Sequence, residues 1–396
     1  MSYSQVKKAR FYVDYVQYLN SMGVCASPEA MEYQGIWNFT VEDPQFMSKV
    51  WGLTNYKPFT LIPGDHPTLG DLGGGIITRK FSGVNLFNWN TDPHMYGIAQ
   101  SLQKCNYIAL FGHNFHTLGL TFKIALKTYD TSTDTEAWQN SDNIEPIYNC
   151  SIYNSNYVQA NSDGVCILGF DGFGLSNYDN LYVADIIIVI EPGDPTTGSW
   201  NDISGMPEIS SISMGKYFDM PMSPDVEISQ STTYETRRHV TKGGKVLSKP
   251  KNMRRPNFGN TSQFDSNTSN LSRSGKKSWL IKYSTLKDVD IMGYNENSTP
   301  FFTESVGDYD STQLQSDQNA FLYNLQDSGH TVEANPDFFT NVIHLTQGRL
   351  PFIFQPDNES FGTSDFNICT FDQNSFEHKQ VGHKTYETSL SITESW

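Results

Sequence analysis

Apolar and polar residues alternate along much of the chain with the period of two that a half-buried β-strand requires. The clearest run is residues 118–127, in which Leu, Phe and Ile occupy every second position. The same alternation recurs in three later segments, residues 225–234, 277–284 and 385–396. Residues 164–170 and 181–190 are apolar almost throughout and have the pattern of central strands, and the second is expected to be buried on both faces. The pattern predicts a mainly β protein.

Two segments have helical rather than strand-like spacing. Residues 12–19 place apolar side chains at roughly helical intervals near the N-terminus. Residues 316–325 form the best helix candidate, because Ser316 can cap the first turn and Gly329 follows the last one. We therefore expect one or two short helices in an otherwise β-rich chain.

Turn-forming residues suggest how the chain divides. Residues 191–207 are rich in Pro, Gly, Asp and Ser, which is typical of a domain boundary. Before this boundary, short strands separated by turns favour a jelly-roll-like β-sandwich. We predict an N-terminal segment, residues 1–84, that packs on the sandwich. The β-sandwich domain then spans residues 85–200, and a second β-rich assembly domain spans residues 201–396.

Composition narrows the function classes. Charged residues make up only 18% of the chain, against roughly 25% in an average domain, and aromatic residues reach 13%. The net charge of −16 argues against general nucleic-acid binding, which needs a basic footprint. No segment approaches the roughly 20 apolar residues of a membrane helix, and the first residues lack the apolar core of a signal peptide. We expect a protein made in a cytoplasm, without a membrane partner.

The sequence offers little chemistry. The common hydrolase and nucleotide-binding motifs are absent, so we expect neither catalysis nor a cofactor. The cysteines are odd in number and have no C-x-x-C spacing, which predicts reduced, mostly buried thiols rather than disulfides or a zinc site. They are Cys25, Cys105, Cys150, Cys166 and Cys369.

Four metal or phosphate candidates have simpler explanations. His113 and His116 are three residues apart, but no Cys or carboxylate nearby completes a ligand set, so hydrogen bonding within a loop is the favoured interpretation. Residues 171–174 and 308–310 offer oxygen ligands for calcium, and each also fits a plain turn. The three glycines at 73–75 lack the residues of a phosphate loop and fit a flexible turn.

The strongest charge feature is a basic cluster in the second half. Eight of the chain's 27 Lys and Arg fall within about twenty residues: Arg237, Arg238, Lys242, Lys245, Lys249, Lys251, Arg254 and Arg255. The two glycines inside residues 240–247 predict a tight hairpin, and the polar stretch 257–274 predicts a long loop. The hairpin and loop together span residues 237–277. A solvated hairpin is one interpretation, and an arm that docks on an acidic neighbouring subunit is the other. Contact with DNA inside a particle is a smaller third possibility.

Several segments resemble virion structural proteins of tailed, often marine, bacteriophages. They are residues 107–114, 187–192, 215–225, 241–248, 278–284, 345–357, 366–371 and 390–396. The likeness lies in strand and turn residues and contains no catalytic signature. It implies a structural protein of the virion, in the tail, tail tip, baseplate or fibre attachment region, made in the host bacterium. Its partners would be other virion proteins and copies of itself.

A carbohydrate-binding module of the tail is the competing prediction. Jelly-roll sandwiches often bind sugars by stacking them on exposed aromatic rings, with polar groups nearby. Trp89, Trp138, Tyr153 and Tyr157 are the candidate rings for a host-surface glycan, although aromatic residues at such positions are more often part of a core. A polysaccharide-degrading enzyme is a third class, which would need a pair of carboxylates brought together by the fold.

Overall fold

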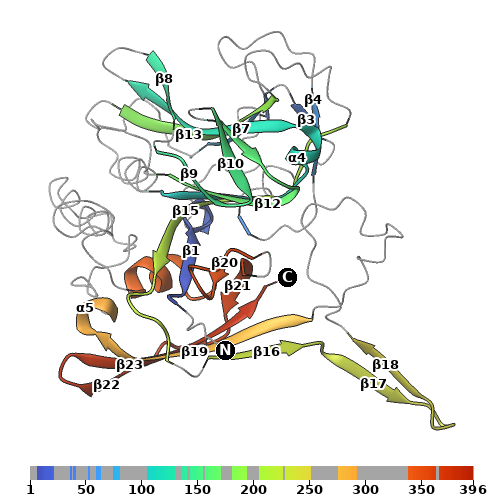
Figure 1. Ribbon diagram of the computed structural model, residues 1–396, viewed down its shortest axis with the longest axis vertical. Helices are drawn as coiled ribbons and strands as arrows, with labels where there is room; N and C mark the ends of the chain where they lie inside the picture. The colour runs from blue at the N-terminus through green and yellow to red at the C-terminus, as the bar shows by residue number, and fades with distance from the viewer. Residues whose placement is uncertain are drawn as a thin grey trace, which may run out of the picture.

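A computed structural model of the chain (Figure 1) confirms the mainly β prediction. The residues that it describes are 7–21, 36–37, 39–41, 52–53, 59–63, 75–80, 105–130, 135–140, 143–154, 157–170, 181–193, 205–225, 228–250, 275–291, 338–362 and 365–395. Every strand pairing among them is antiparallel.

The elements of the first half begin with β1 (Arg10–Asp14), α1 (Tyr15–Ser21), β2 (Ile36–Trp37), β3 (Phe39–Val41), β4 (Phe59–Pro63) and β5 (Gly75–Lys80). They continue with β6 (Tyr107–His113), α4 (Phe115–Leu118), β7 (Leu120–Asp130), β8 (Thr135–Asn140), β9 (Glu145–Tyr148), β10 (Cys150–Asn154), β11 (Tyr157–Ala160), β12 (Gly164–Gly169) and β13 (Leu181–Pro192).

The elements of the second half are β14 (Glu208–Ile209), β15 (Ser211–Asp219), β16 (Ser229–Thr233), β17 (Thr236–Val240), β18 (Val246–Pro250), β19 (Lys276–Lys287), α5 (Asp288–Ile291), the π-helix η5 (Phe339–His344), β20 (Phe352–Gln355), β21 (Asn367–Phe371), β22 (His378–Gly382) and β23 (Thr385–Glu394). The predicted helix at 316–325 lies outside the described residues.

Two large sheets dominate the described part of the chain. The larger has the order β16-β19-β23-β21-β20-β1-β15-β6-β12-β9, with β22 paired to β23. The second has the order β10-β11-β7-β13-β5-β2, with β8 paired to β7. Two small sheets, β14-β4-β3 and β17-β18, complete the pairings.

Strand β15 lies between β1 and β6 and connects the two parts of the larger sheet. Its residues 211–215 pair with β6 and its residues 215–219 pair with β1 (Figure 1). Gly215 lies at the changeover, where a Cβ atom would come within 1.9 Å of the Val13 carbonyl oxygen, so only glycine allows this approach. The larger sheet therefore takes strands from all three predicted parts of the chain. The division at residues 84 and 200 stays a prediction.

Strands β6 and β12 are buried on both faces. On one face, side chains of these strands share a core cluster with the second sheet: Ile108, Leu110, Cys166, Leu168, Phe122, Ile124, Val158, Ile188 and Ile190. On the other face, a second cluster joins Tyr107, Ala109, Phe111 and Ile167 to Tyr12, Ile353, Phe366 and Ile368. This double burial explains why both strands read as continuous apolar runs.

The N-terminal region corrects one prediction. Residues 12–14 belong to strand β1, and the helix starts only at Tyr15. Phe11 and Val13 enter the larger core cluster while Tyr12 enters the other, which is the alternation of a strand. The Asp14 carboxylate then accepts a hydrogen bond from the Gln17 backbone N–H at 2.8 Å, which caps the first turn of α1.

Candidate interaction surface

The predicted hairpin in the basic cluster is present. Strands β17 and β18 pair from Thr236 opposite Pro250 to Val240 opposite Val246, and we call residues 236–250 the basic arm. Its loop is closed by hydrogen bonds from the Thr241 N–H to the Lys245 carbonyl and from the Gly244 N–H to the Thr241 carbonyl, each 2.9 Å long. Gly244 has a φ of +76°, a conformation that favours glycine, which explains one of the two glycines in the loop.

The basic arm extends away from the large sheets (Figure 1). All five residues of β17 are exposed. Apolar side chains are exposed here too: Val240 is 55% exposed, Val246 46% and Leu247 48%. Neither core cluster of the described residues includes a residue of the arm. Since a two-stranded hairpin alone is marginally stable in water, a contact that covers these side chains would stabilise the arm.

Each face of the basic arm combines cations with apolar groups. The register places Arg237 opposite Lys249 and His239 opposite Leu247, so these two pairs share one face. The salt bridges among the described residues do not include the cations of the arm. A mixed apolar and cationic surface suits an acidic protein partner.

The structure locates five of the eight predicted contact residues on the basic arm. Arg237, Arg238, Lys242 and Lys245 are exposed, and Lys249 lies on β18. The other three, Lys251, Arg254 and Arg255, lie outside the described residues, as does the predicted loop 257–274. The acidic residues of a matching surface were not identifiable from sequence order, because carboxylates are spread along the whole chain.

The two candidate metal ligands, His113 and His116, both contact other groups of the protein. His113 ends β6 and is fully buried, and burial lowers its pKa to about 4. Its Nδ1 accepts a weak hydrogen bond from the Phe115 N–H at 3.4 Å. His116 lies on α4, and its Nδ1 is 3.0 Å from the Ala160 carbonyl oxygen. Across the part of the chain that the structure describes, no group of three or more His, Cys, Asp or Glu could hold a metal ion.

The remaining metal and thiol candidates lie only partly within the described residues. The possible calcium ligands at 171–174 and 308–310 lie outside the described residues, and of the three glycines only Gly75 is described, as the first residue of β5. Four of the cysteines are described, and all four are buried as predicted. Burial raises the pKa of the Cys150 thiol to about 12, which leaves it unreactive at neutral pH.

Of the two candidate sugar-binding rings whose side chains the structure describes, Tyr153 is exposed and Tyr157 is partly buried. Tyr153 on β10 is 45% exposed beside Ile152, which is 49% exposed. Tyr157 on β11 is partly buried, and the Lys123 ammonium lies 4.9 Å from the centre of its ring. Trp138 lies on β8, whose side chains are not described, and Trp89 lies outside the described residues.

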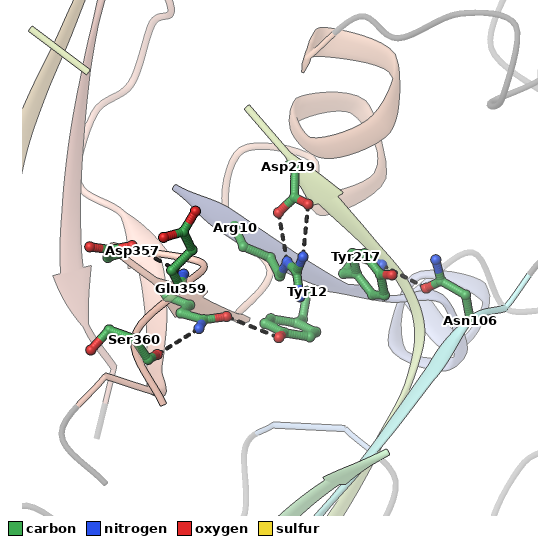
Figure 2. A network of polar contacts seen from close by, with 9 residues as sticks. Arg10, Tyr12, Asn106, Tyr217, Asp219, Asp357, Glu359 and Ser360 are labelled. Atoms are coloured by element: carbon green, nitrogen blue, oxygen red, sulfur yellow. Dashed lines mark hydrogen bonds and ion pairs between the residues drawn. The ribbon is translucent and has the colours of Figure 1, made fainter. Parts of the chain in front are cut away.

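A polar network that the sequence did not predict holds β1 in place (Figure 2). The Arg10 guanidinium donates two hydrogen bonds to Asp219 on β15, at 2.6 and 2.8 Å, and lies 4.3 Å from the centre of the Tyr217 ring. The Tyr12 hydroxyl donates to the Gln355 side-chain oxygen at 3.0 Å. These partners are more than 200 positions apart, so no local pattern could reveal them. Their role is to connect three strands of the larger sheet.

Comparison with known proteins finds no matching family model, no matching curated sequence and no matching solved structure. Among the described residues, no helix is long and apolar enough to cross a membrane.

Proposed function

We propose that this chain is a non-enzymatic structural component of a tailed-phage virion, located in the tail, the tail tip or baseplate, or the fibre attachment region. The single observation that carries the proposal is the basic arm, whose exposed cations and apolar side chains fit a contact with another subunit. The exposed arm supports the proposal on physical grounds, in addition to the resemblance of several segments to phage structural proteins.

The strand order supports a jelly-roll organisation of the sandwich. Eight strands in chain order, β1, β5, β6, β7, β11, β12, β13 and β15, pair first with last, second with seventh, third with sixth and fourth with fifth. They give the sheet orders β1-β15-β6-β12 and β5-β13-β7-β11. Nested pairing across two sheets is the arrangement of a jelly roll, an architecture used by viral capsid proteins and lectins. The architecture alone does not decide between these functions.

Composition of purified particles tests the proposed location. Virions produced from a genome that encodes this chain are purified, their proteins quantified by mass spectrometry, and the chain located by immunogold labelling. The proposal expects a fixed number of copies per particle and labelling at the tail. Absence of the chain from intact, infectious particles would contradict it.

Carbohydrate binding is the second candidate, favoured by the exposed Tyr153 and Ile152 on β10. Calorimetric titration of the full chain with host-surface glycans tests it. Saturable binding that Tyr153→Ala abolishes and Tyr153→Phe retains would support ring stacking, because Phe keeps the aromatic face. Lack of binding would leave the structural function as the remaining candidate.

A further inference from the structure

The basic arm has the opposite charge to the rest of the chain. It contains five Lys and Arg and no Asp or Glu, while the remaining residues contain 22 Lys and Arg against 43 Asp and Glu, a net charge of −21. The arm extends away from the large sheets (Figure 1), and the salt bridges among the described residues do not include its cations. A second copy of the chain offers the complementary charge.

Two carboxylates, Asp163 and Glu208, are held in place by the short helix α4 and the residue before it. The Asp163 carboxylate accepts hydrogen bonds from the Thr117 N–H at 3.0 Å and from the Thr117 hydroxyl. The Asn114 side chain donates to the Met206 carbonyl and accepts from the Glu208 N–H, both at 2.8 Å. The backbone that carries each carboxylate is therefore fixed by a contact with the same turn of helix.

These two carboxylates repel each other. Burial and, after it, the negative charge of Asp163 raise the pKa of Glu208. The described segments around them, residues 114–118, 160–164 and 205–209, contain no Lys or Arg. The salt bridges among the described residues include neither carboxylate. A cation brought by another molecule would relieve the repulsion.

Apolar side chains are exposed beside both sets of charges. Met206, two residues before Glu208, is 47% exposed, and the basic arm exposes Val240, Val246 and Leu247. We call Met206, Glu208 and Asp163 the acidic surface. It matches the arm in combining charge with apolar groups, and its charge has the opposite sign. Figure 1 shows α4 and the arm in different parts of the molecule, so the two surfaces of one copy do not face each other.

We propose that the basic arm of one copy docks on the acidic surface of a second copy, with the cations of the arm against Asp163 and Glu208. This inference rests on the proposed function, in which the arm contacts another subunit, and names that subunit and its surface. Because the two surfaces differ, the contact is heterologous. Its repetition gives a ring where the rotation between copies closes and a filament where it does not.

Complementation between two variants tests this contact. Sedimentation velocity of the full chain at low ionic strength is expected to show self-association that increases with concentration and weakens with added salt. Glu208→Lys alters the acidic surface, and Arg237→Glu with Arg238→Glu alters the arm. Each variant is expected to raise the dissociation constant at least tenfold, since like charges then meet. An equimolar mixture of the two is expected to associate again, because the intact arm of one variant meets the intact acidic surface of the other.

Glu359→Lys is the matched control, because it makes the same change in charge at a side chain that is 67% exposed. It should associate as the unmodified chain does, and thermal unfolding should show that every variant is folded. A chain that stays monomeric at every concentration, association that Glu208→Lys leaves unchanged, or a mixture that does not associate would each overturn the contact. None of these results affects the proposed place in the virion, which particle composition tests separately.

Discussion

At the scale of single residues, Asp14 is a buried carboxylic acid that also caps a helix. Its carboxylate caps helix α1 through the Gln17 N–H, and it is only 3% exposed. Burial raises the pKa of Asp14 from an ordinary 3.8 to about 7. The folded protein therefore holds a proton that the unfolded chain releases between these two values.

This shift predicts a pH-dependent stability. The contribution of protonated Asp14 is fully present below pH 3.8 and is lost as the pH rises through about 7. Asp14→Asn keeps the capping oxygen and cannot ionise, so at pH 8 we expect it to be more stable than the unmodified chain by up to about 4 kcal/mol. Denaturant unfolding of both proteins at pH 5 and pH 8 measures this. Equal pH dependence in the two proteins would contradict the assignment.

Arg10 gives a second prediction at this scale. Arg10→Ala removes two charge-assisted hydrogen bonds and leaves Asp219 without this partner, and we expect a loss of about 2–4 kcal/mol in the free energy of unfolding. Lys7→Ala is the control, because the Lys7–Glu359 pair is 4.0 Å apart with side chains 52% and 67% exposed. Such a surface pair contributes about 0–1 kcal/mol. Similar losses for the two variants would show that the Arg10 network does not hold β1.

At the scale of elements, the period-two pattern located many strands correctly. The predicted strands at 118–127, 164–170, 181–190 and 385–396 correspond to β7, β12, β13 and β23. Within the predicted helix 12–19, residues 15–19 belong to α1 as expected, and residues 12–14 were wrongly assigned because, over so few residues, apolar positions fit either period. Residues 12–14 form a strand because β15 and β20, which lie far along the chain, pair with β1. Sequence order contains no signal for that choice.

The glycine at the changeover of β15 provides an element-scale prediction. Gly215→Ala would place a methyl group against the Val13 carbonyl, so β1 and β15 would have to separate. We expect a loss of more than about 3 kcal/mol, measured by thermal and denaturant unfolding. Gly243→Ala in the loop of the basic arm meets no atom within 4 Å, so we expect a change below about 0.5 kcal/mol. An equally mild effect at Gly215 would mean that the two strands are not in close contact.

At the scale of the whole molecule, the large sheet and the two core clusters connect the first half of the chain to the second. The sequence predicted the basic hairpin, because its glycines and cations are local features. The sequence could not predict that β6 and β12 are covered on both faces, because an apolar run does not identify the elements that pack on it. The basic arm lies outside both clusters of the described residues, and the proposed contact between subunits would cover its exposed apolar and cationic side chains.

The most direct test of this account is incorporation of a charge-reversed arm into particles. Arg237→Glu with Arg238→Glu changes side chains that are exposed and lie outside both core clusters, so folding and thermal stability should be retained. Lys8→Glu with Lys384→Glu, at two exposed positions outside the basic arm, is the control with the same change in charge. Each variant is supplied to a phage that lacks the gene, and copies per purified particle are counted. The account predicts at least a tenfold loss of incorporation for the arm variant and normal incorporation for the control. Normal incorporation of the folded arm variant would contradict it.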